Sequence, residues 1–386
     1  MGKLDALIAE LCPDGVIFEE VGKLSKTLSP SIKIKKNDYL AEGIYPIIDQ
    51  GQEFIGGYTN EESAFTVDEY IVFGDHTCVV KYIDFAFVQG ADGVKVIKAD
   101  SMRVLPKYLY YCMSNIKMDI SYARHWSKIR IEKVPVPPLE VQGEIVRILD
   151  AFTEHTTKLI SELTSELTSR KNQHNYYRNI LLDGDITAKE YYLEEICQVI
   201  DCPHTSPKWK ESGIPVIRNY NLINGTISTN NLSYVDEAEY EVRIKRAKPQ
   251  MNDILFSREA PIGNVGIIPA GLKCCQGQRV VLLRANTNIV IPQYLLYILQ
   301  SGSVQEQIEK VEKIGSTVSN YNISDLRKLK VTIPPFDKQN YSIEKMKKLN
   351  TYYFEIKNSL LTEIELCQRQ YSYYRDRLLD FKKIGA

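Results

Sequence analysis

The hydrophobic pattern of this chain contains a long stretch that occurs twice. Residues 134–183 and 331–380 can be aligned with each other without a gap. In each copy a short extended run ends in a double proline, and larger side chains then recur in steps of three and four. Proline biases the residue before it away from the helical region, so a helix can begin only after the prolines. Each copy therefore predicts a helix of about 40 residues, roughly 60 Å long at about 1.5 Å per residue.

The larger side chains of the two predicted helices form a matching seam, with polar residues elsewhere. In the first helix the seam contains Leu149, Phe152, Leu159, Leu163, Leu167, Tyr177 and Leu181. In the second it contains Met346, Leu349, Ile356, Leu360, Ile364, Tyr374 and Leu378. A helix of this kind has an apolar stripe to bury, and the other copy is the obvious partner. The alternative is two unrelated amphipathic helices that each lie on a globular domain, but it leaves the matched seam unexplained.

The segments 16–133 and 191–330 are rich in short β-type runs broken by Gly, Asn and Asp. They resemble each other weakly but in the same order. The matching runs are YPII at 45–48 with IPVI at 214–217, DEYIVFG at 68–74 with NDILFS at 252–257, Gln89-Gly90 with Gln276-Gly277, and LPKYLYY at 105–111 with IPQYLLY at 291–297. Each half of the chain is therefore expected to be a mixed α/β domain followed by one long helix.

The predicted limits follow from this order. We expect a first globular domain at 1–138 with a short N-terminal helix, a first spacer helix at 139–183, a second globular domain at 184–335 and a second spacer helix at 336–382. The N-terminal sequence LCPDG echoes LLDGD at the end of the first helix. The N-terminus is therefore expected to pack near the helix ends, in a circular arrangement of two half-units.

Composition narrows the functional classes. The 386 residues are 44% hydrophobic and 25% charged, with a net charge of −1, so any contact with DNA must come from local basic faces. The eight cysteines form no CxxC pair, and Cys197, Cys202 and His204 lack a fourth ligand of suitable spacing. We therefore expect no metal site and reduced thiols. No signal-peptide core and no membrane-spanning run is seen, which indicates a cytoplasmic protein.

The motifs that catalysis and cofactor binding need are absent from the sequence. The sequence has no Walker A motif, no glycine-rich turn suited to a nucleotide cofactor, and no Asn/Asp-Pro-Pro-aromatic loop of the kind that methylates amino groups. His76 lies beside Asp75, but nothing nearby supplies a nucleophile. The sequence predicts no active site and no cofactor in this chain.

Several loops combine cations for phosphate with amides and guanidinium groups for base edges, the mixture that nucleic-acid recognition needs. In the first domain these candidates are Lys33, Lys35, Lys36, Gln50, Gln52, Arg124, Lys128 and Arg130. In the second they are His204, Lys208, Lys210, Arg218, Asn219, Arg258, Gln276, Gln278, Arg279 and Asn320. The alternative for any one of them is an ordinary solubilising surface residue.

A globular domain, a PxPP run, a glutamine shortly afterwards and a long helix occur in this order twice. Together with VPVPPLEVQGEIVRIL, IPVIRNYNLINGTI and DILFSREAPIGNVGIIPAG followed by CCQGQRVVLLR, this order resembles the specificity subunit of Type I restriction–modification enzymes. The resemblance covers the whole chain. The second repeat departs from the family pattern at 336–338 and 341–342, where Phe-Asp-Lys and Tyr-Ser stand.

The resemblance implies a non-catalytic subunit of a multisubunit methyltransferase and endonuclease. Each globular domain would read one half of a split double-stranded DNA target, and the helices would form an antiparallel coiled-coil spacer with pseudo-twofold symmetry. Two methyltransferase subunits that use S-adenosylmethionine would dock on the helices, and two ATP- and Mg-dependent nuclease–translocase subunits would complete the complex. Two alternatives stay open, a nuclease with an unrecognised active site and a coiled-coil scaffold that binds only proteins.

Overall fold

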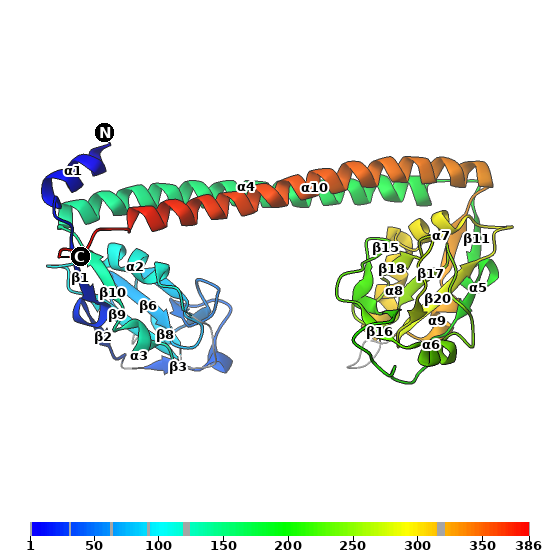
Figure 1. Ribbon diagram of the computed structural model, residues 1–386, viewed down its shortest axis with the longest axis horizontal. Coiled ribbons are helices and arrows are strands. Elements are labelled where there is room, and N and C mark those ends of the chain that lie inside the picture. Colours follow the sequence, from blue (N-terminus) through cyan, green and yellow to red (C-terminus); the bar gives the residue numbers. More distant parts are fainter. Residues whose placement is uncertain are drawn as a thin grey trace. The chain divides into compact units, whose positions relative to one another are not determined.

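The computed structural model describes residues 2–30, 32–61, 65–90, 93–118, 124–314 and 321–385. The chain divides into two compact units. Unit 1 consists of Met1–Leu163 and Thr362–Ala386, and unit 2 consists of Thr164–Leu361. Each unit contains one globular part and about half of each long helix (Figure 1).

Unit 1 is built around a four-stranded antiparallel sheet of order β2-β9-β6-β7, beside a second sheet of order β3-β8-β4-β5. Its elements are α1 (Lys3–Leu11), β1 (Ile17–Glu20), β2 (Ser25–Leu28), β3 (Lys33–Ile34), β4 (Tyr45–Ile48), β5 (Gly57–Thr59), β6 (Tyr70–Gly74), β7 (Val80–Ile83), β8 (Val88–Gly90), β9 (Val94–Ala99), α2 (Pro106–Asn115), α3 (Trp126–Ile129), β10 (Lys133–Val136) and the first part of α4 (Leu139–Asp183). All five residues of β6 are buried, as expected for a central strand. Helix α2 lies between this sheet and α4, where the Tyr111 hydroxyl donates to Asp150 Oδ1 at 2.6 Å (Figure 1).

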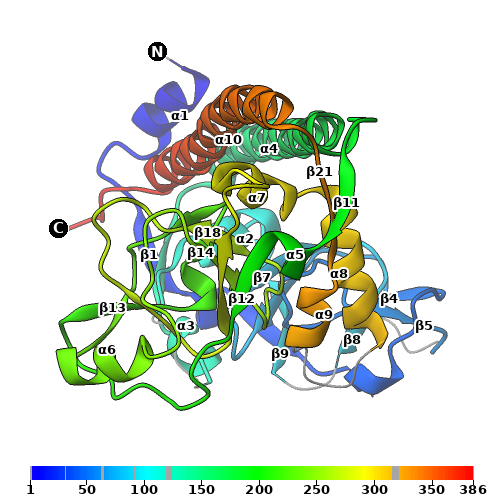
Figure 2. The same ribbon diagram turned by 90° about the vertical axis from the view of Figure 1, so that its right-hand side faces the viewer.

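Unit 2 repeats the plan with the sheet β12-β20-β17-β18, whose two outer strands β12 and β18 are labelled in Figure 2, and a smaller sheet β16-β13-β19. Its elements are β11 (Lys189–Tyr192), α5 (Leu193–Ile196), β12 (Cys197–Ile200), β13 (Ile214–Ile217), β14 (Leu222–Ile223), β15 (Thr226–Ile227), β16 (Ser233–Val235), α6 (Glu237–Arg243), β17 (Ile254–Ser257), β18 (Val265–Ile267), β19 (Cys275–Gln276), β20 (Val280–Ala285), α7 (Pro292–Ile298), α8 (Gly302–Ile314), α9 (Ile323–Arg327), β21 (Lys330–Ile333) and the first part of α10 (Phe336–Leu378). Helices α2 and α7 both begin with proline at the first turn, where its missing N–H is not needed. The predicted mixed α/β class is confirmed.

One buried glutamine fastens each long helix to its globular part. Gln142 is fully buried, and its Oε1 accepts a hydrogen bond from Leu105 N at 2.8 Å. Its Nε2 donates to Pro137 O at 2.7 Å and to Arg103 O at 3.0 Å. A single amide therefore ties the double-proline run and the loop before α2 to the first turn of α4.

Unit 2 contains the same arrangement. Gln339 is 1% exposed, and its Oε1 accepts from Ile291 N at 2.8 Å. Its Nε2 donates to Pro334 O at 2.9 Å and to Ile289 O at 3.0 Å. The glutamine that follows each double proline is thus a structural clamp.

The two long helices pack on each other in an antiparallel sense within each unit. In unit 1 the Thr153 hydroxyl lies 3.0 Å from the Tyr371 hydroxyl. In unit 2 His174 Nε2 lies 2.8 Å from Asn350 Oδ1. In the repeat alignment Thr153 corresponds to Asn350 and Tyr371 to His174, so this is one contact with the two helices exchanged. The predicted helix pair and its pseudo-twofold relation are confirmed.

Burial along the predicted seam is uneven. Leu149 and Met346 are each 1% exposed, in the parts of α4 and α10 that the globular cores also cover. Further along, the seam residues are half-buried or exposed, and Tyr177 is 47% exposed. Two helices without a third layer can cover only part of each other's apolar stripe. Near the far helix ends it is Leu182 and Leu379, one position beyond the predicted residues, that are buried.

The helix contact in unit 2 makes its stability depend on pH. Burial, aided by the charge of Arg178, lowers the pKa of His174 from 6.5, although its hydrogen bond to Asn350 acts in the opposite direction. The unfolded chain takes up this proton near pH 6.5 while the folded chain resists it, so stability is lost as the pH falls below about 6.5. We expect His174→Tyr, which places the residue of position 371 there, to flatten this decline in thermal unfolding measured between about pH 7.5 and 5.5. The exposed-site variant His155→Gln is the control and should keep the decline; an unchanged slope in His174→Tyr would contradict this assignment.

The two ends of the chain lie together in unit 1. Val16 N donates to Lys382 O at 2.8 Å, and Ile384 N donates to Val16 O at 3.1 Å. Gly15 has φ +102°, and a Cβ there would lie 2.4 Å from Lys382 O, so only glycine permits this approach. The expected packing of the N-terminal segment near the helix ends is confirmed.

Candidate nucleic-acid interface

In both units, parallel strands bring polar loops to one edge. In unit 1, β4 and β8 pair in parallel with Ile48 opposite Gln89, and β3 continues the sheet. In unit 2, β13 and β19 pair in parallel with Ile217 opposite Gln276. The carboxyl ends of parallel strands meet at the same edge, so the residues that follow these strands are neighbours. Several of the predicted recognition residues follow these strands, among them Gln50 after β4, Arg218 after β13 and Arg279 after β19.

In unit 1 this edge is organised around Asp75, which follows β6. Asp75 N donates to Gly93 O at 2.5 Å, and Asp75 O accepts from His125 N at 2.9 Å. The buried carboxylate accepts from Trp126 N at 2.7 Å, which fixes the start of α3. Gln50 lies against the same loops, because its Oε1 accepts from His76 N at 3.3 Å.

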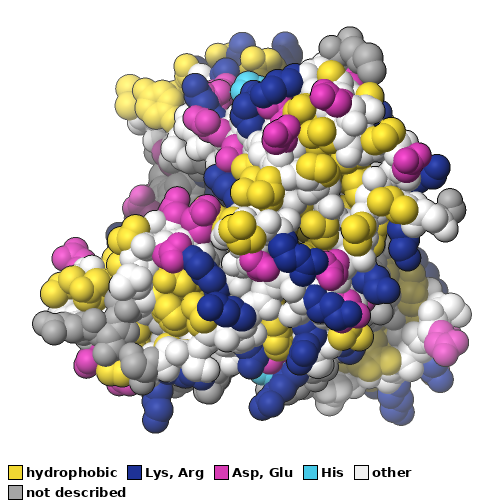
Figure 3. All heavy atoms as spheres, turned by 90° about the vertical axis from the view of Figure 1, so that its left-hand side faces the viewer, with side chains coloured by type: hydrophobic (Ala, Val, Ile, Leu, Met, Phe, Trp, Pro, Cys, Tyr) yellow, Lys and Arg dark blue, Asp and Glu magenta, His cyan; other side chains and the backbone are white. Residues whose placement is uncertain are grey.

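The basic residues predicted for unit 1 lie on or near β3 and α3, but Arg130 lies at the opposite end of the main sheet from Asp75, where its backbone O accepts from Gly22 N at 2.8 Å. Lys33, Lys35 and Lys36 are exposed on β3 and the turn after it, and Arg124, Lys128 and Arg130 are exposed around α3. Gln52 lies apart from them, in the wall of a cavity beside β7. Figure 3 shows basic side chains interspersed with acidic and apolar ones on the face that it presents, rather than one continuous basic patch among the described residues.

In unit 2 the same backbone framework holds an arginine in place of the aspartate. Arg258 N donates to Arg279 O at 2.9 Å, and Arg258 O accepts from Tyr321 N at 2.8 Å. Arg279 takes φ +69° where Gly93 of unit 1 takes +66°, so the left-handed turn is kept although the side chain differs. The two units thus place opposite charges on one framework.

The guanidinium group of Arg258 is held in place from two sides. Its Nε donates to Tyr321 O at 2.7 Å and its Nη1 to Asp201 Oδ1 at 3.2 Å. Beside it is a hollow of about 220 Å³ that Cys202, His204, Arg258, Gln278 and Arg279 line. Gln278 Nε2 donates to His204 O at 2.9 Å, and Arg279 forms an ion pair with Glu259. The two arginines make the hollow suited to an anionic group.

Three potential metal ligands lie in the same region. Ligand atoms of Asp201, Cys202 and His204 lie within 4.8 Å of one another. However, the Asp201 carboxylate already pairs with Arg258, and Cys202 Sγ accepts from Arg279 N at 3.0 Å. Burial raises the pKa of the Cys202 thiol, so it is not a ready thiolate ligand. Two guanidinium groups beside the trio disfavour a cation, so the residues present do not fit a metal.

Arg218 forms a second candidate contact in unit 2. Its guanidinium carbon lies 4.9 Å from the ring centroid of Tyr220 and 5.5 Å from that of Trp209. The two rings are 41% and 46% exposed, so the arginine is held between aromatic faces at the surface. Lys208 is exposed in the same loop as Trp209, and Lys210 pairs with Asp236 at 3.2 Å. This group offers an oriented guanidinium with stacking surfaces beside it.

Three of the predicted residues are not among these candidate contacts. Gln276 is 3% exposed, and its Nε2 donates to Ile200 O and Val280 O at 3.2 Å, so its amide holds strands together and is not available to a ligand. Asn219 Nδ2 donates to Ala260 O at 2.8 Å and thereby fixes the loop after β17. Asn320 lies outside the described residues. We leave Gln276 out of the candidate interface.

The acidic residues that pair with the predicted arginines were not predicted from the sequence. Asp201 and Glu259, which orient and partly neutralise Arg258 and Arg279, carry no local signal because they come from other loops. Tyr220 could have been found, since it lies two positions after Arg218, within the run IRNYN.

The comparisons with known proteins agree with this architecture. The family model "Type I restriction modification DNA specificity domain" matches residues 19–169 and 186–366. The chain is 29% identical over 398 residues to the EcoR124I/EcoR124II type I restriction enzyme specificity subunit of Escherichia coli, covering 96% of each chain. It is 29% identical over 350 residues to a putative type I restriction enzyme specificity subunit of Haemophilus influenzae, covering 86% of each. A structure solved in work on complex assembly of a type I R-M system matches with a TM-score of 0.66 at 16% identity, covering 95% of this chain and 98% of that one.

The fold defines a class of protein in which one mixed α/β framework occurs twice and two long antiparallel helices connect the two copies. Both copies of the framework lie within the two family matches. The chain belongs to the Type I restriction modification DNA specificity family. In the part of the chain that the structure describes, no helix is both long and apolar enough to span a membrane.

Proposed function

We propose that this chain is the DNA-recognition subunit of a Type I restriction–modification complex. Each globular part reads one half of a split double-stranded DNA sequence, and the paired helices set the distance between the half-sites. The edge with Asp75 and Gln50 in unit 1 and the edge with Arg258 and Arg218 in unit 2 are the reading surfaces.

The main support is that the same backbone framework carries an acidic side chain in unit 1 and a basic one in unit 2. The backbone hydrogen bonds around Asp75 recur around Arg258, yet the central side chain changes from an acid to a base. A scaffold that bound the same group twice would have no need for opposite charges at equivalent positions. Two different base sequences do require different donors and acceptors at the reading edge.

The catalytic steps are proposed to belong to partner subunits. Two methyltransferase subunits that bind S-adenosylmethionine dock on the α4–α10 pair, and two ATP-dependent nuclease–translocase subunits join to cleave DNA. The sequence of this chain has neither a nucleotide-binding loop nor a methyltransferase motif, which supports that division. The whole complex is proposed to work in the cytoplasm on chromosomal and incoming DNA.

A map of methylated adenines tests the proposal directly. DNA is sequenced from cells that carry the matching methyltransferase, with and without this chain. We expect a split motif with a fixed gap that appears only when the chain is present. If the chain copurifies with the methyltransferase but no motif appears, the chain is a protein scaffold and the proposal fails. Metal-dependent nicking of plasmid DNA by the purified chain alone would instead support a nuclease.

A short repeat in α4 predicts a change of spacing. Residues 161–168 read SELTSELT, and four helical residues span about 6 Å, close to two base pairs at about 3.4 Å each. Deleting or adding one SELT unit should change the gap between the half-sites by about one or two base pairs in the methylation map. Four residues are slightly more than one turn, so the variant can slide along its partner helix with little loss of packing. Unchanged spacing would show that the helix length has no metric role.

A further inference from the structure

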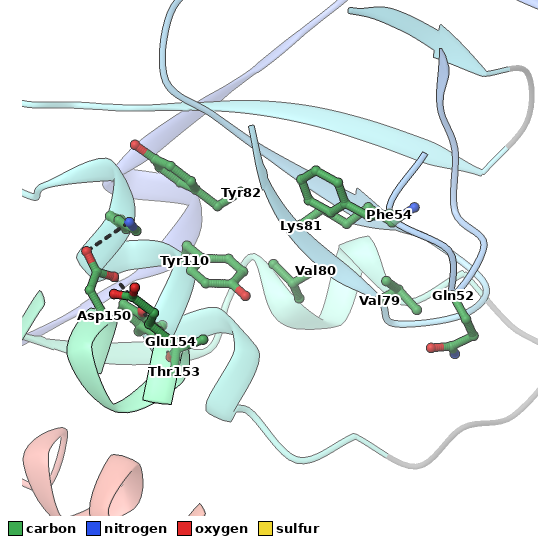
Figure 4. A pocket seen from close by; sticks show the side chains of 12 residues that line it. Gln52, Phe54, Val79, Val80, Lys81, Tyr82, Tyr110, Asp150, Thr153 and Glu154 are labelled. Atoms are coloured by element: carbon green, nitrogen blue, oxygen red, sulfur yellow. Dashed lines mark hydrogen bonds and ion pairs between the residues drawn. The ribbon is translucent and has the colours of Figure 1, made fainter. Parts of the chain in front are cut away.

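A cavity of about 620 Å³ lies in unit 1 between β7, α2, the start of α4 and the loop 49–56 (Figure 4). Four consecutive residues of the β7 region, Val79 to Tyr82, line it. Successive strand residues point to opposite faces, so four in a row can line a cavity only if the backbone edge of the strand faces it. β7 is the last strand of its sheet, so this edge has no strand partner among the described residues.

In unit 2 the corresponding strand carries a hairpin. Strands β14 and β15 form the hairpin, and Ile267 N in β18 donates to Gly225 O at its tip at 3.2 Å. A Cβ at Gly266 would lie 2.7 Å from Thr226 O, so glycine there permits the close approach. The edge of β18 is therefore covered by a segment of the chain itself.

The cavity walls occupy the positions that touch this hairpin. The strand registers pair Ile71 with Tyr82 in unit 1 and Ile254 with Ile267 in unit 2. A Cβ at Gly225 would lie 3.3 Å from Leu296 Cδ2. The wall residues Lys81, Tyr82 and Tyr110 correspond to Gly266, Ile267 and Leu296.

The cavity is open because the preceding connection is short. In unit 1, residues 49–56 join β4 to β5. In unit 2, the longer connection 218–232 joins β13 to β16 and contains the hairpin. Unit 1 thus keeps the receiving edge but lacks the segment that covers it in unit 2.

The chemistry of the cavity favours a peptide over DNA. The rings of Tyr82 and Tyr110 are 6.0 Å apart, and Phe54, which is 49% exposed, lies on the opposite side (Figure 4). Asp150 and Glu154 of α4 add carboxylates at one end, and Asp150 is paired with Lys107 at 2.8 Å. Carboxylates repel phosphates, whereas a strand edge with aromatic walls suits an extended apolar segment.

We propose that this cavity is the docking site for an extended segment of the methyltransferase subunit, which adds to the free edge of β7 as the hairpin adds to β18. The segment places an apolar side chain between Phe54 and Tyr110 and a Lys or Arg beside Glu154. The inference rests on the proposed function, which supplies this partner. It is favoured by continuity, because α4 forms both one wall of the cavity and part of the proposed methyltransferase surface.

Site-specific cross-linking in the reconstituted complex tests the proposal. The photo-reactive amino acid p-benzoylphenylalanine replaces Phe54, and a matched chain carries it at Tyr192, an exposed residue of β11 in unit 2. Without DNA, we expect the Phe54 position to cross-link to one contiguous peptide of the methyltransferase, identified by mass spectrometry. The Tyr192 position should give no cross-link to the methyltransferase, and both chains must still direct methylation.

Binding measurements supply a second readout. Phe54→Ala with Glu154→Arg should weaken association with the purified methyltransferase by about tenfold or more, and Glu61→Arg, an exposed control in unit 1, should not. A chain that assembles and directs methylation normally, but cross-links at position 54 only to DNA, only to the nuclease–translocase or to nothing, overturns the docking site and leaves the proposed function intact. If the unaltered chain neither assembles with the methyltransferase nor directs methylation, the proposed function itself is overturned.

Discussion

Replacing Gln142 with alanine is expected to lower the free energy of unfolding of unit 1 by about 3–5 kcal/mol. The reason is the number of backbone groups that depend on one side chain. Without the amide, Leu105 N, Pro137 O and Arg103 O all lose their partner in a site where Gln142 is fully buried. Each orphaned buried group costs about 1–3 kcal/mol, and the exposure of Arg103 keeps the sum below the maximum.

The repeat provides internal controls for this prediction. Gln339→Ala should have a similar effect on unit 2, because its three hydrogen bonds are the same. The exposed Gln173→Ala should change stability by less than about 0.5 kcal/mol. Gln142→Glu should be as harmful as alanine or more, since a carboxylate would face two carbonyl oxygens. Urea unfolding followed by circular dichroism measures all four; equal midpoints for Gln142→Ala and Gln173→Ala would show that the clamp has no role in stability.

The clamp also shows how far sequence reasoning could reach. The alignment of the repeats identified Gln142 and Gln339 as equivalent, because both follow a double proline at the same spacing. Their partners could not be predicted, because Leu105 lies 37 residues before Gln142 and Ile291 lies 48 residues before Gln339, and only tertiary structure brings them together. The two long helices, in contrast, could be predicted, because hydrophobic periodicity depends only on local sequence.

The two loop edges proposed to read DNA could not be predicted from local sequence alone. Lys33 and Lys128 could be identified as cations from the sequence, and the structure places Lys33 on β3 and Lys128 in α3, whose first residue donates to Asp75. Gln276 was indistinguishable from them in sequence, although its amide is used to join strands. Burial of a polar side chain depends on which strands meet over it, and that pairing is not encoded at the residue itself. The correspondence of Asp75 with Arg258 likewise becomes visible only through their backbone hydrogen bonds.

A large loss of DNA affinity is expected when Arg218 is replaced. Trp209 and Tyr220 hold its guanidinium group between their exposed rings, so little side-chain freedom is lost when it meets DNA. A bidentate contact between arginine and a base contributes about 1–3 kcal/mol to discrimination. Arg218→Ala should therefore raise the Kd of the assembled complex for its target about 10- to 100-fold, at fixed salt.

Two further variants decide what Arg218 contacts. Arg218→Lys keeps the charge but loses the planar fork, so a base contact predicts nearly the full loss, and a phosphate contact predicts a small one. Lys189→Ala removes an exposed cation on β11, away from the reading edge, and should leave the Kd unchanged. Fluorescence anisotropy over a salt series separates the two roles, because losing a phosphate contact weakens all sequences alike and reduces the salt slope by about one. If Arg218→Ala binds target and unrelated DNA as the unaltered complex does, the aromatic pair holds Arg218 for the fold of unit 2 alone, and base reading there must rest on Arg258 and its neighbours.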